Sequence, residues 1–262
     1  MDEKIKKIAI EAVKKSGKML LGEYGGFNRA NVELKSHHEI MTKCDLASEK
    51  IIIDAVRKNF PDHRILSEEK GGLKGDGEYY WIIDPIDGTT NFTIHNPLWS
   101  ISVGIAKIDK NGTKKMVLGI VYAPVLDEMF LAELGKGATL NGKKIKPSKI
   151  KSGKVLNAFC HSTNPKDIKK AIKYYSYQKL HDFDCRQMGS AAIEMAFVAC
   201  GRIESIMIPG AHPWDVSAGA LLVREAGGKV TDFAGKEWNL DSRDIFASNR
   251  LVHGRILKII NR

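Results

Sequence analysis

Polar and apolar positions in the first quarter of the chain follow two amphipathic helices framed by short strands. The pattern predicts helices over residues 3–24 and 46–60 and strands over residues 32–35 and 64–66. Gly25 and Gly26 are expected to end the first helix, and Pro61 the second. Lysines occupy the face of the first helix opposite its apolar residues, as is typical of a helix at the protein surface.

The middle of the chain reads as a series of strands separated by turn residues. Apolar runs predict strands over residues 79–84, 99–108, 116–123 and 128–133. Asn111-Gly112 and Pro124 lie between these runs, and Asn141-Gly142 marks a further hairpin turn. This order favours an antiparallel meander.

The second half alternates between strands and helices. Strands are predicted near residues 155–160, 203–208, 230–233 and 245–247, and helices near residues 167–175, 189–200, 214–226 and 251–260. A meander followed by alternation predicts an α/β (α+β) fold of layered helices and mixed sheets. The basic stretch at residues 143–154 lacks periodicity, so we expect a single domain of two lobes, residues 1–145 and 150–262.

Composition indicates an ordinary soluble protein. The 262 residues are 43% hydrophobic and 27% charged, enough for a full core. No apolar run approaches the roughly 18 residues of a membrane span, and the N-terminus lacks a signal-peptide core, so we expect a cytoplasmic protein without a membrane partner. The four scattered cysteines do not have zinc-ligand spacing or suggest a disulfide framework, and we expect reduced, mostly buried thiols.

The net charge of +10 favours anionic partners. The lysines occur in small groups with few aromatic residues among them, whereas nucleic-acid grooves more often combine charge with aromatic stacking. The pattern therefore favours phosphorylated small molecules over DNA or RNA.

The strongest chemical signal is Trp-Ile-Ile-Asp-Pro-Ile-Asp-Gly-Thr-Thr at residues 81–90. An apolar strand is expected to end at Asp84, and a proline turn leads to a second acid, Asp87, so that both carboxylates can share a cation. Gly88 and Thr89 follow at an apparent helix start, where N–H groups can bind phosphate. Carboxylates repel phosphate unless metal ions lie between them, so this motif predicts metal-assisted hydrolysis of a phosphate ester.

Three other acids extend this motif. Glu68 follows the predicted strand at residues 64–66, and Asp45 and Asp215 lie at predicted helix starts. Taken singly, such residues are most often surface groups or helix caps. Direct attack by water requires no cysteine nucleophile, and an oxygen-only ligand set is the type that Mg²⁺ prefers.

Together these residues identify the chain as a member of the inositol monophosphatase family, part of the lithium-sensitive phosphatase superfamily that includes fructose-1,6-bisphosphatases. Residues 81–92 resemble the first signature of the family, and residues 214–219 with 225–228 the second. Shorter similarities occur at residues 119–124, 135–138 and 189–192, so the resemblance covers nearly the whole chain.

The resemblance implies two to three Mg²⁺ ions. Glu68, Asp84 and the carbonyl oxygen of Ile86 would bind the first ion, and Asp84, Asp87 and Asp215 the second. A third, looser ion near Glu68 would have mostly water ligands. The second ion would steady the leaving alkoxide.

The resemblance also implies roles in catalysis and substrate binding. The implied catalytic residues are Asp45, Thr89 and Glu68, with Thr89 and Asp45 orienting and deprotonating the attacking water. The implied substrate and phosphate contacts are Asp87, Gly88, Thr89, Lys35, Gly189, Ser190 and Ala191. A homodimer is expected on the same basis.

Two positions depart from the family pattern. Glu39 replaces an aspartate that is common near the third ion. At Ile208, seven residues before Asp215, inositol-preferring members have an acid that binds substrate hydroxyls, so this chain is expected to prefer inositol less. For His212, a packing role is favoured over general-acid catalysis. The pair His37-His38 is read as an exposed loop, and Ser162 as a weak candidate for substrate contact.

The sequence leaves several functions open. A Mg²⁺-dependent phosphomonoesterase for inositol 1-phosphate or a similar sugar phosphate is favoured. Fructose-1,6-bisphosphatase activity, with or without dual specificity, and phosphatase activity on 3′-phosphoadenosine 5′-phosphate or NADP are alternatives within the class. A basic scaffold that binds RNA or an acidic protein, or a sensor of phosphate metabolites, would lie outside it.

Overall fold

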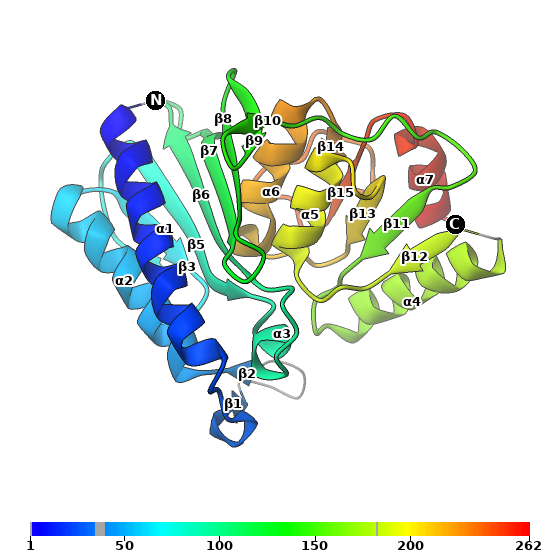
Figure 1. Ribbon diagram of the computed structural model, residues 1–262. Coiled ribbons are helices and arrows are strands. Elements are labelled where there is room, and N and C mark those ends of the chain that lie inside the picture. The colour runs from blue at the N-terminus through cyan, green and yellow to red at the C-terminus, as the bar shows by residue number, and fades with distance from the viewer. Residues whose placement is uncertain (1, 35–39, 182) are drawn as a thin grey trace.

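The computed structural model describes residues 2–34, 40–181 and 183–262, which form alternating layers of helices and sheets (Figure 1). The helices of the described residues are α1 (Glu3–Tyr24), α2 (Lys43–Asn59), α3 (Thr89–Thr93), α4 (Pro165–Leu180), α5 (Ala191–Cys200), α6 (Pro213–Ala226) and α7 (His253–Ile260). A short 3-10 helix (Arg29–Asn31) precedes a two-stranded sheet of β1 (Glu33–Leu34) and β2 (Ile40–Met41).

The larger sheet has eight strands and is almost entirely antiparallel. In spatial order they are β10 (Lys143–Lys144), β9 (Gly137–Leu140), β8 (Glu128–Glu133), β7 (Lys114–Ala123), β6 (Ser100–Ile108), β5 (Tyr79–Asp87), β3 (Arg64–Ser67) and β4 (Gly71–Leu73). The pair β3–β5 is parallel, with Ser67 opposite Ile83. The strands from β5 to β8 form the predicted meander, and β9 extends it by one strand that was not predicted.

The smaller sheet has five strands of mixed direction. In spatial order they are β12 (Asp184–Arg186), β11 (Leu156–Phe159), β13 (Ser205–Ile208), β15 (Ile245–Ser248) and β14 (Lys229–Thr231). Strand β11 runs parallel to both of its neighbours, and β15 is antiparallel to both of its own. Two sheets with mixed strand directions confirm the predicted fold class.

The helices form three layers around the two sheets (Figure 1). Helices α1 and α2 cover one face of the large sheet, and α5 and α6 lie between the sheets, where α6 contacts β6, β7 and β8 and α5 contacts β13 and β15. Helices α4 and α7 cover the outer face of the small sheet. Because α5 and α6 belong to the second half of the chain yet pack on the first sheet, the division into lobes 1–145 and 150–262 stays a prediction.

Local sequence explains how the first two helices begin. Asp2 caps α1 by accepting a hydrogen bond from the N–H of Lys4 at 2.8 Å. Thr42 and Asp45 form a capping box at the start of α2, so this helix begins three residues earlier than the predicted residue 46. Helix α4 is also longer than predicted, since it starts at Pro165 and reaches Leu180.

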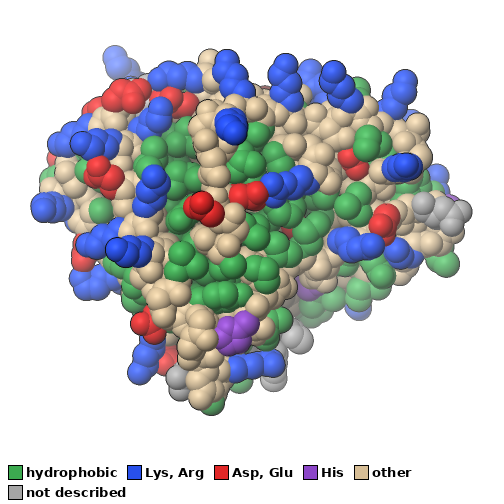
Figure 2. Space-filling model, viewed as in Figure 1, with side chains coloured by type: hydrophobic (Ala, Val, Ile, Leu, Met, Phe, Trp, Pro, Cys, Tyr) green, Lys and Arg blue, Asp and Glu red, His purple; other side chains and the backbone are tan. Residues whose placement is uncertain are grey.

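Figure 2 shows one face of the molecule, which carries both charged side chains and exposed hydrophobic surface. On the face shown in Figure 2, Lys and Arg side chains lie singly or in small groups around exposed hydrophobic surface.

Cys44 and Cys185 are buried, Cys160 and Cys200 are partly exposed, and all four are free thiols. None of the helices in the described part of the chain combines the length and the apolar character that crossing a bilayer requires.

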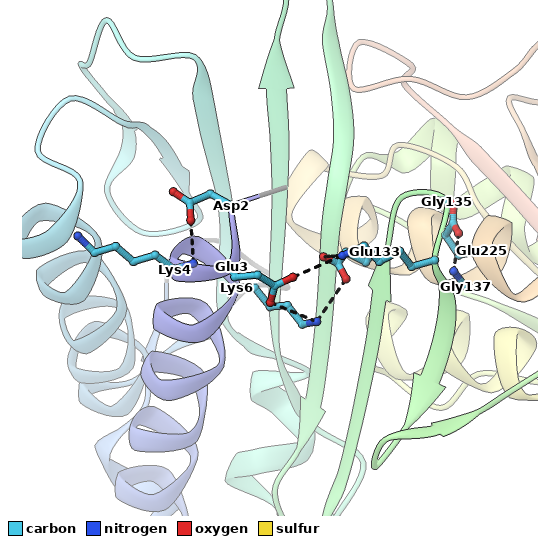
Figure 3. Close-up of polar contacts among 9 residues, drawn as sticks. Asp2, Glu3, Lys4, Lys6, Glu133, Gly135, Gly137 and Glu225 are labelled. Carbon is cyan, nitrogen blue, oxygen red and sulfur yellow. Dashed lines mark hydrogen bonds and ion pairs between the residues drawn. The ribbon is translucent and has the colours of Figure 1, made fainter.

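Glu225, part of the second signature, supports the large sheet. Its two carboxylate oxygens accept the N–H groups of Gly135 (3.0 Å) and Gly137 (2.9 Å) in the turn between β8 and β9 (Figure 3). Beside it, Glu133 pairs with Lys6 (3.3 Å) and Lys136 (2.9 Å), which connects α1 to the same turn. The position of Glu225 in the signature therefore reflects packing between α6 and the sheet.

Candidate active site

The acidic motif lies at the end of β5, inside the large sheet. The sequence predicted that this strand stops at Asp84, which is wrong: β5 continues to Asp87, and its register with β6 shifts between the two acids. Pro85 has no N–H for the ladder, and the N–H of Ile86 bonds to the Asp84 carboxylate (3.1 Å) instead. Both carboxylates therefore lie on an irregular strand end rather than on a tight turn.

Gly88 makes the sharp change from strand to helix. It has a left-handed backbone (φ 88°) and caps α3, which begins where the sequence predicted a helix start. A Cβ atom at this position would lie 3.0 Å from the carbonyl oxygen of Gly189 and 3.2 Å from that of Leu98. Only glycine therefore lets the loop before α5 approach the motif closely.

The start of α5 holds the Asp87 carboxylate. Its Oδ1 accepts the N–H of Ala191 (3.1 Å), and its Oδ2 accepts the N–H of Ala192 (3.0 Å) and the hydroxyl of Ser190. Burial raises the pKa of Asp87 to about 6, and these hydrogen bonds oppose the rise. Ser190, expected to contact phosphate, thus uses its hydroxyl on Asp87.

Three acids lie around Asp84. Burial, followed by the negative charges of Glu68, Asp87 and Asp215, raises the pKa of Asp84 well above its ordinary value. Direct interaction with the side chain of Glu68 adds to the rise in the pKa of Asp84. Residues from β5, from the turn after β3 and from α6 are thereby brought within electrostatic reach of one another.

Asp45 and Thr89 form a second polar group next to these acids. One oxygen of the buried Asp45 carboxylate accepts the N–H (2.8 Å) and hydroxyl (2.7 Å) of Thr42, and the other accepts the hydroxyl of Thr89 (3.1 Å). The Thr89 hydroxyl also lies 2.9 Å from the carbonyl oxygen of Ile86. Burial raises the pKa of Asp45 to about 6.

An open cavity of about 450 Å³ connects these groups. The predicted site residues in its wall are Glu68, Asp87, Gly88, Thr89, Gly189, Ala191 and Asp215. Ile208, Ser162 and His212 also line it. Asp84, Asp45, Ile86 and Ser190 are buried directly behind this wall. Lys35, His37, His38 and Glu39 lie outside the described residues.

Two of the lining residues have their own packing partners. The ring of His212 stacks on Trp214 (4.7 Å between centroids), and its backbone N–H bonds to the Asp215 carboxylate at 3.1 Å. The hydroxyl of Ser162 donates to Asp167 at 2.7 Å. His212 thus has the packing contact that the sequence favoured for it.

The donor set fits a divalent metal by its chemistry. Several buried carboxylates with mutually raised pKa values provide the oxygen ligands and negative charge that Mg²⁺ prefers. Among the residues that the structure describes, no three His, Cys, Asp or Glu side chains converge closely enough to hold an ion as they stand.

Two buried glutamates beside the site were missed by the sequence reading. Glu49 on α2 accepts hydrogen bonds from the turn that carries Glu68, and Glu194 on α5 accepts the N–H of Met188 and the thiol of Cys160. The position of Glu49, four residues after Asp45 on the buried side of an amphipathic helix, was the available signal.

Comparison with known proteins agrees with this geometry. The family model described as the inositol monophosphatase family matches residues 1–262. The chain belongs to the inositol monophosphatase family. A relative from Thermotoga maritima, named "Fructose-1,6-bisphosphatase/inositol-1-monophosphatase", is 37% identical over 97% of this chain and 94% of its own length. An Escherichia coli relative named "Nus factor SuhB" is 36% identical over 94% of this chain and 91% of its own length.

The fold of the family is confirmed by solved structures. The extragenic suppressor protein suhB from Bartonella henselae superposes with a TM-score of 0.89 at 29% identity, covering 98% of both chains. Membership indicates a phosphatase, and enzymes of this family are generally metal-dependent.

Proposed function

We propose that this protein is a Mg²⁺-dependent phosphomonoesterase that hydrolyses inositol 1-phosphate or a related sugar phosphate with water as the nucleophile. The observation that carries the proposal is the hydrogen bond from Thr89 to Asp45 beside the acids of one cavity. This contact supports a role for Asp45 as the base, beside the carboxylates and the N–H groups that would bind phosphate.

The residues that would hold the metal are those implied by the family pattern. Glu68, Asp84 and the carbonyl oxygen of Ile86 would bind one ion, and Asp84, Asp87 and Asp215 another, for two to three ions in all. Bound Mg²⁺ would lower the pKa of water and offset the charge of the phosphate. The hydrogen bonds from the start of α5 would keep Asp87 in a fixed orientation.

Thr89 and Asp45 would then take up the proton of the attacking water. Since the hydroxyl of Thr89 donates to Asp45, its oxygen is free to accept a proton from water as its own proton passes to the carboxylate. A pKa of about 6 leaves Asp45 ionised at neutral pH and still able to accept this proton. The N–H groups of Gly88 and Thr89 would bind phosphate oxygens, and Gly189 and Ala191 line the same cavity.

The residues on the substrate side of the cavity do not favour one of the candidate phosphorylated substrates over the others. Ile208 contributes an apolar surface where an acid would accept inositol hydroxyls. The Thermotoga relative carries a name with both activities, which supports fructose 1,6-bisphosphate as an alternative or second substrate. 3′-Phosphoadenosine 5′-phosphate and NADP remain alternatives as phosphorylated metabolites.

A binding role is the second candidate, because a relative of 36% identity carries the name Nus factor SuhB. With a net charge of +10, an RNA or an acidic protein would be the partner. Steeply salt-dependent RNA binding that survives replacement of Asp87 would support this candidate. The homodimer and the cytoplasmic location stay predictions.

The test of the enzyme proposal is phosphate release from four substrates: inositol 1-phosphate, fructose 1,6-bisphosphate, 3′-phosphoadenosine 5′-phosphate and NADP. Each reaction would be run with Mg²⁺ and again after removal of metal by EDTA. We expect release that requires Mg²⁺ and a ranking of rates that names the substrate class. Absence of release from all four, in protein that binds Mg²⁺, would contradict the proposal and favour the binding role.

A further inference from the structure

Glu49 is a fully buried carboxylate on α2 that contacts the turn joining β3 to β4. Its Oε1 atom accepts three hydrogen bonds, from the hydroxyl of Ser67, the N–H of Glu69 (3.1 Å) and the N–H of Lys70 (3.0 Å). Its Oε2 atom has no hydrogen-bond partner among the described residues. The three hydrogen bonds of the Glu49 carboxylate are therefore directed at one short turn.

That turn carries Glu68. The three donors come from the residue before Glu68 and the two residues after it, so the backbone on both sides of Glu68 is attached to Glu49. The N–H of Glu68 bonds to the carbonyl oxygen of Ile83 (3.1 Å), directly before Asp84. With the neighbouring N–H groups turned toward Glu49, the Glu68 side chain lies in the cavity wall.

Helix α2 also contacts the other parts of the site. Asp45 accepts the Thr89 hydroxyl, and Ser48 donates to the carbonyl oxygen of Pro85 (2.8 Å), between the two acids of β5. Asp45, Ser48 and Glu49 are all fully buried and lie within about one turn of the helix. Helix α2 thus carries the predicted base, Asp45, and contacts the segments that carry Thr89, the acidic motif and Glu68.

We propose that Glu49 is a positioning residue that sets the orientation of Glu68 for metal binding. The proposal rests on the metal-dependent function proposed above. A side chain that orients a metal ligand through its backbone typically changes metal affinity or activity by about 10- to 100-fold when it is altered. Glu49 meets this description because it contacts the segment that carries the ligand and lines no part of the cavity itself.

The negative charge of Glu49 matters as well as its shape. Three donors converge on one oxygen, and hydrogen bonds to an ionised acceptor are roughly twice as strong as neutral ones. In Glu49→Gln the amide oxygen would accept these bonds more weakly, and the NH₂ group would occupy the position of Oε2, where the described residues offer no partner. We expect the Glu68 turn to loosen while the helix stays intact.

The experiment compares Mg²⁺ binding to the wild type and to Glu49→Gln by calorimetry on metal-free protein, together with the Mg²⁺ concentration that gives half-maximal phosphate release. We expect both the Kd and this activation constant to rise at least about tenfold, with kcat at saturating Mg²⁺ within about threefold of the wild type. Ser67→Ala, which removes one of the three donors, should give a smaller rise in the same direction.

Glu204→Gln is the matched control. Glu204 is also a buried carboxylate that accepts a backbone N–H (Leu156, 2.7 Å), but it lies beside the small sheet. Its variant should bind Mg²⁺ as the wild type does.

If Glu49→Gln only lowers the unfolding temperature and leaves the Mg²⁺ Kd unchanged, Glu49 is merely structural and the proposal is wrong, while the proposed function stands. A wild type that binds no Mg²⁺ would overturn both. A wild type that binds Mg²⁺ but hydrolyses none of the substrates would remove the proposed function only, because the Kd comparison still tests Glu49.

Discussion

Replacing Glu194 by glutamine should make the stability of the metal-free protein less dependent on pH. Glu194 lies in α5, fully buried, and its carboxyl group accepts the thiol of Cys160 (2.8 Å) and the N–H groups of Met188 and Gly189. Burial raises its pKa from 4.5 to about 8, and the charge of Asp87 adds to the rise, whereas the hydrogen bonds oppose it.

The size of the effect follows from the difference in pKa between the folded and unfolded chains. Below pH 4.5 the group is protonated in both states, and well above pH 8 it is ionised in both. Between these values the folded protein binds the proton more tightly, so the free energy of unfolding falls as the pH rises, by up to about 5 kcal/mol from this group. For a chain of this length that corresponds to about 10 °C in the unfolding temperature.

The assay is thermal unfolding followed by circular dichroism from pH 5 to pH 9, with EDTA, for the wild type and Glu194→Gln. Asp45, Asp84 and Asp87 also have raised pKa values, but they are present in both proteins, so their direct contributions largely cancel in the comparison. The wild type should lose stability relative to the variant as the pH rises. Cys160→Ala is the control, because it removes a partner but keeps the ionisable carboxyl group. Parallel curves for the wild type and Glu194→Gln would refute the reasoning.

Three further results are expected. Ile208→Glu should raise kcat/KM for inositol 1-phosphate relative to fructose 1,6-bisphosphate by about tenfold, the effect of one hydrogen bond to a charged group; an unchanged ratio would mean that this residue does not contact the substrate. Thr89→Val should lower kcat by about a hundredfold in steady-state kinetics, whereas Thr89→Ser, which keeps the hydroxyl, should retain most activity. Burial lowers the pKa of His253 from 6.5 to about 4, so in urea unfolding the wild type should lose about 3 kcal/mol of stability relative to His253→Asn as the pH falls from 6.5 to 4. The same pH dependence in both proteins would contradict this assignment.

The sequence predicted the longer elements because their patterns are strong and local. The spacing of buried residues in α1, such as Ile5, Ala9 and Val13, is the helical period itself. The strands β2, β4, β9, β10 and β12 were missed, since two to four residues cannot show a clear period. The end of β5 was misjudged because Pro85 reads as a turn, while the bond from Ile86 to Asp84 lets the strand resume at Asp87.

The acidic motif was visible because its residues are adjacent in the chain. The supporting carboxylates were not, because their partners come from elsewhere: Glu49 holds a turn about 20 residues away, and its own neighbours in sequence read simply as helix. Ser190 illustrates a second limit of prediction from the sequence. Its position in a family-like segment suggested phosphate binding, whereas the hydroxyl group bonds to Asp87, 103 residues earlier. Contacts of this kind depend on tertiary structure and cannot be read from local pattern.

Turnover of Asp87→Asn at saturating Mg²⁺ is the most direct test of the claim that these acids form a metal-dependent phosphatase site. The substitution keeps the shape of a buried side chain and removes one negative charge from the reacting centre. Measured on the best substrate of the wild type, kcat should fall at least about a hundredfold. Asp184→Asn, at an exposed position on β12, should leave kcat within about twofold. Near-wild-type turnover in Asp87→Asn would contradict the account.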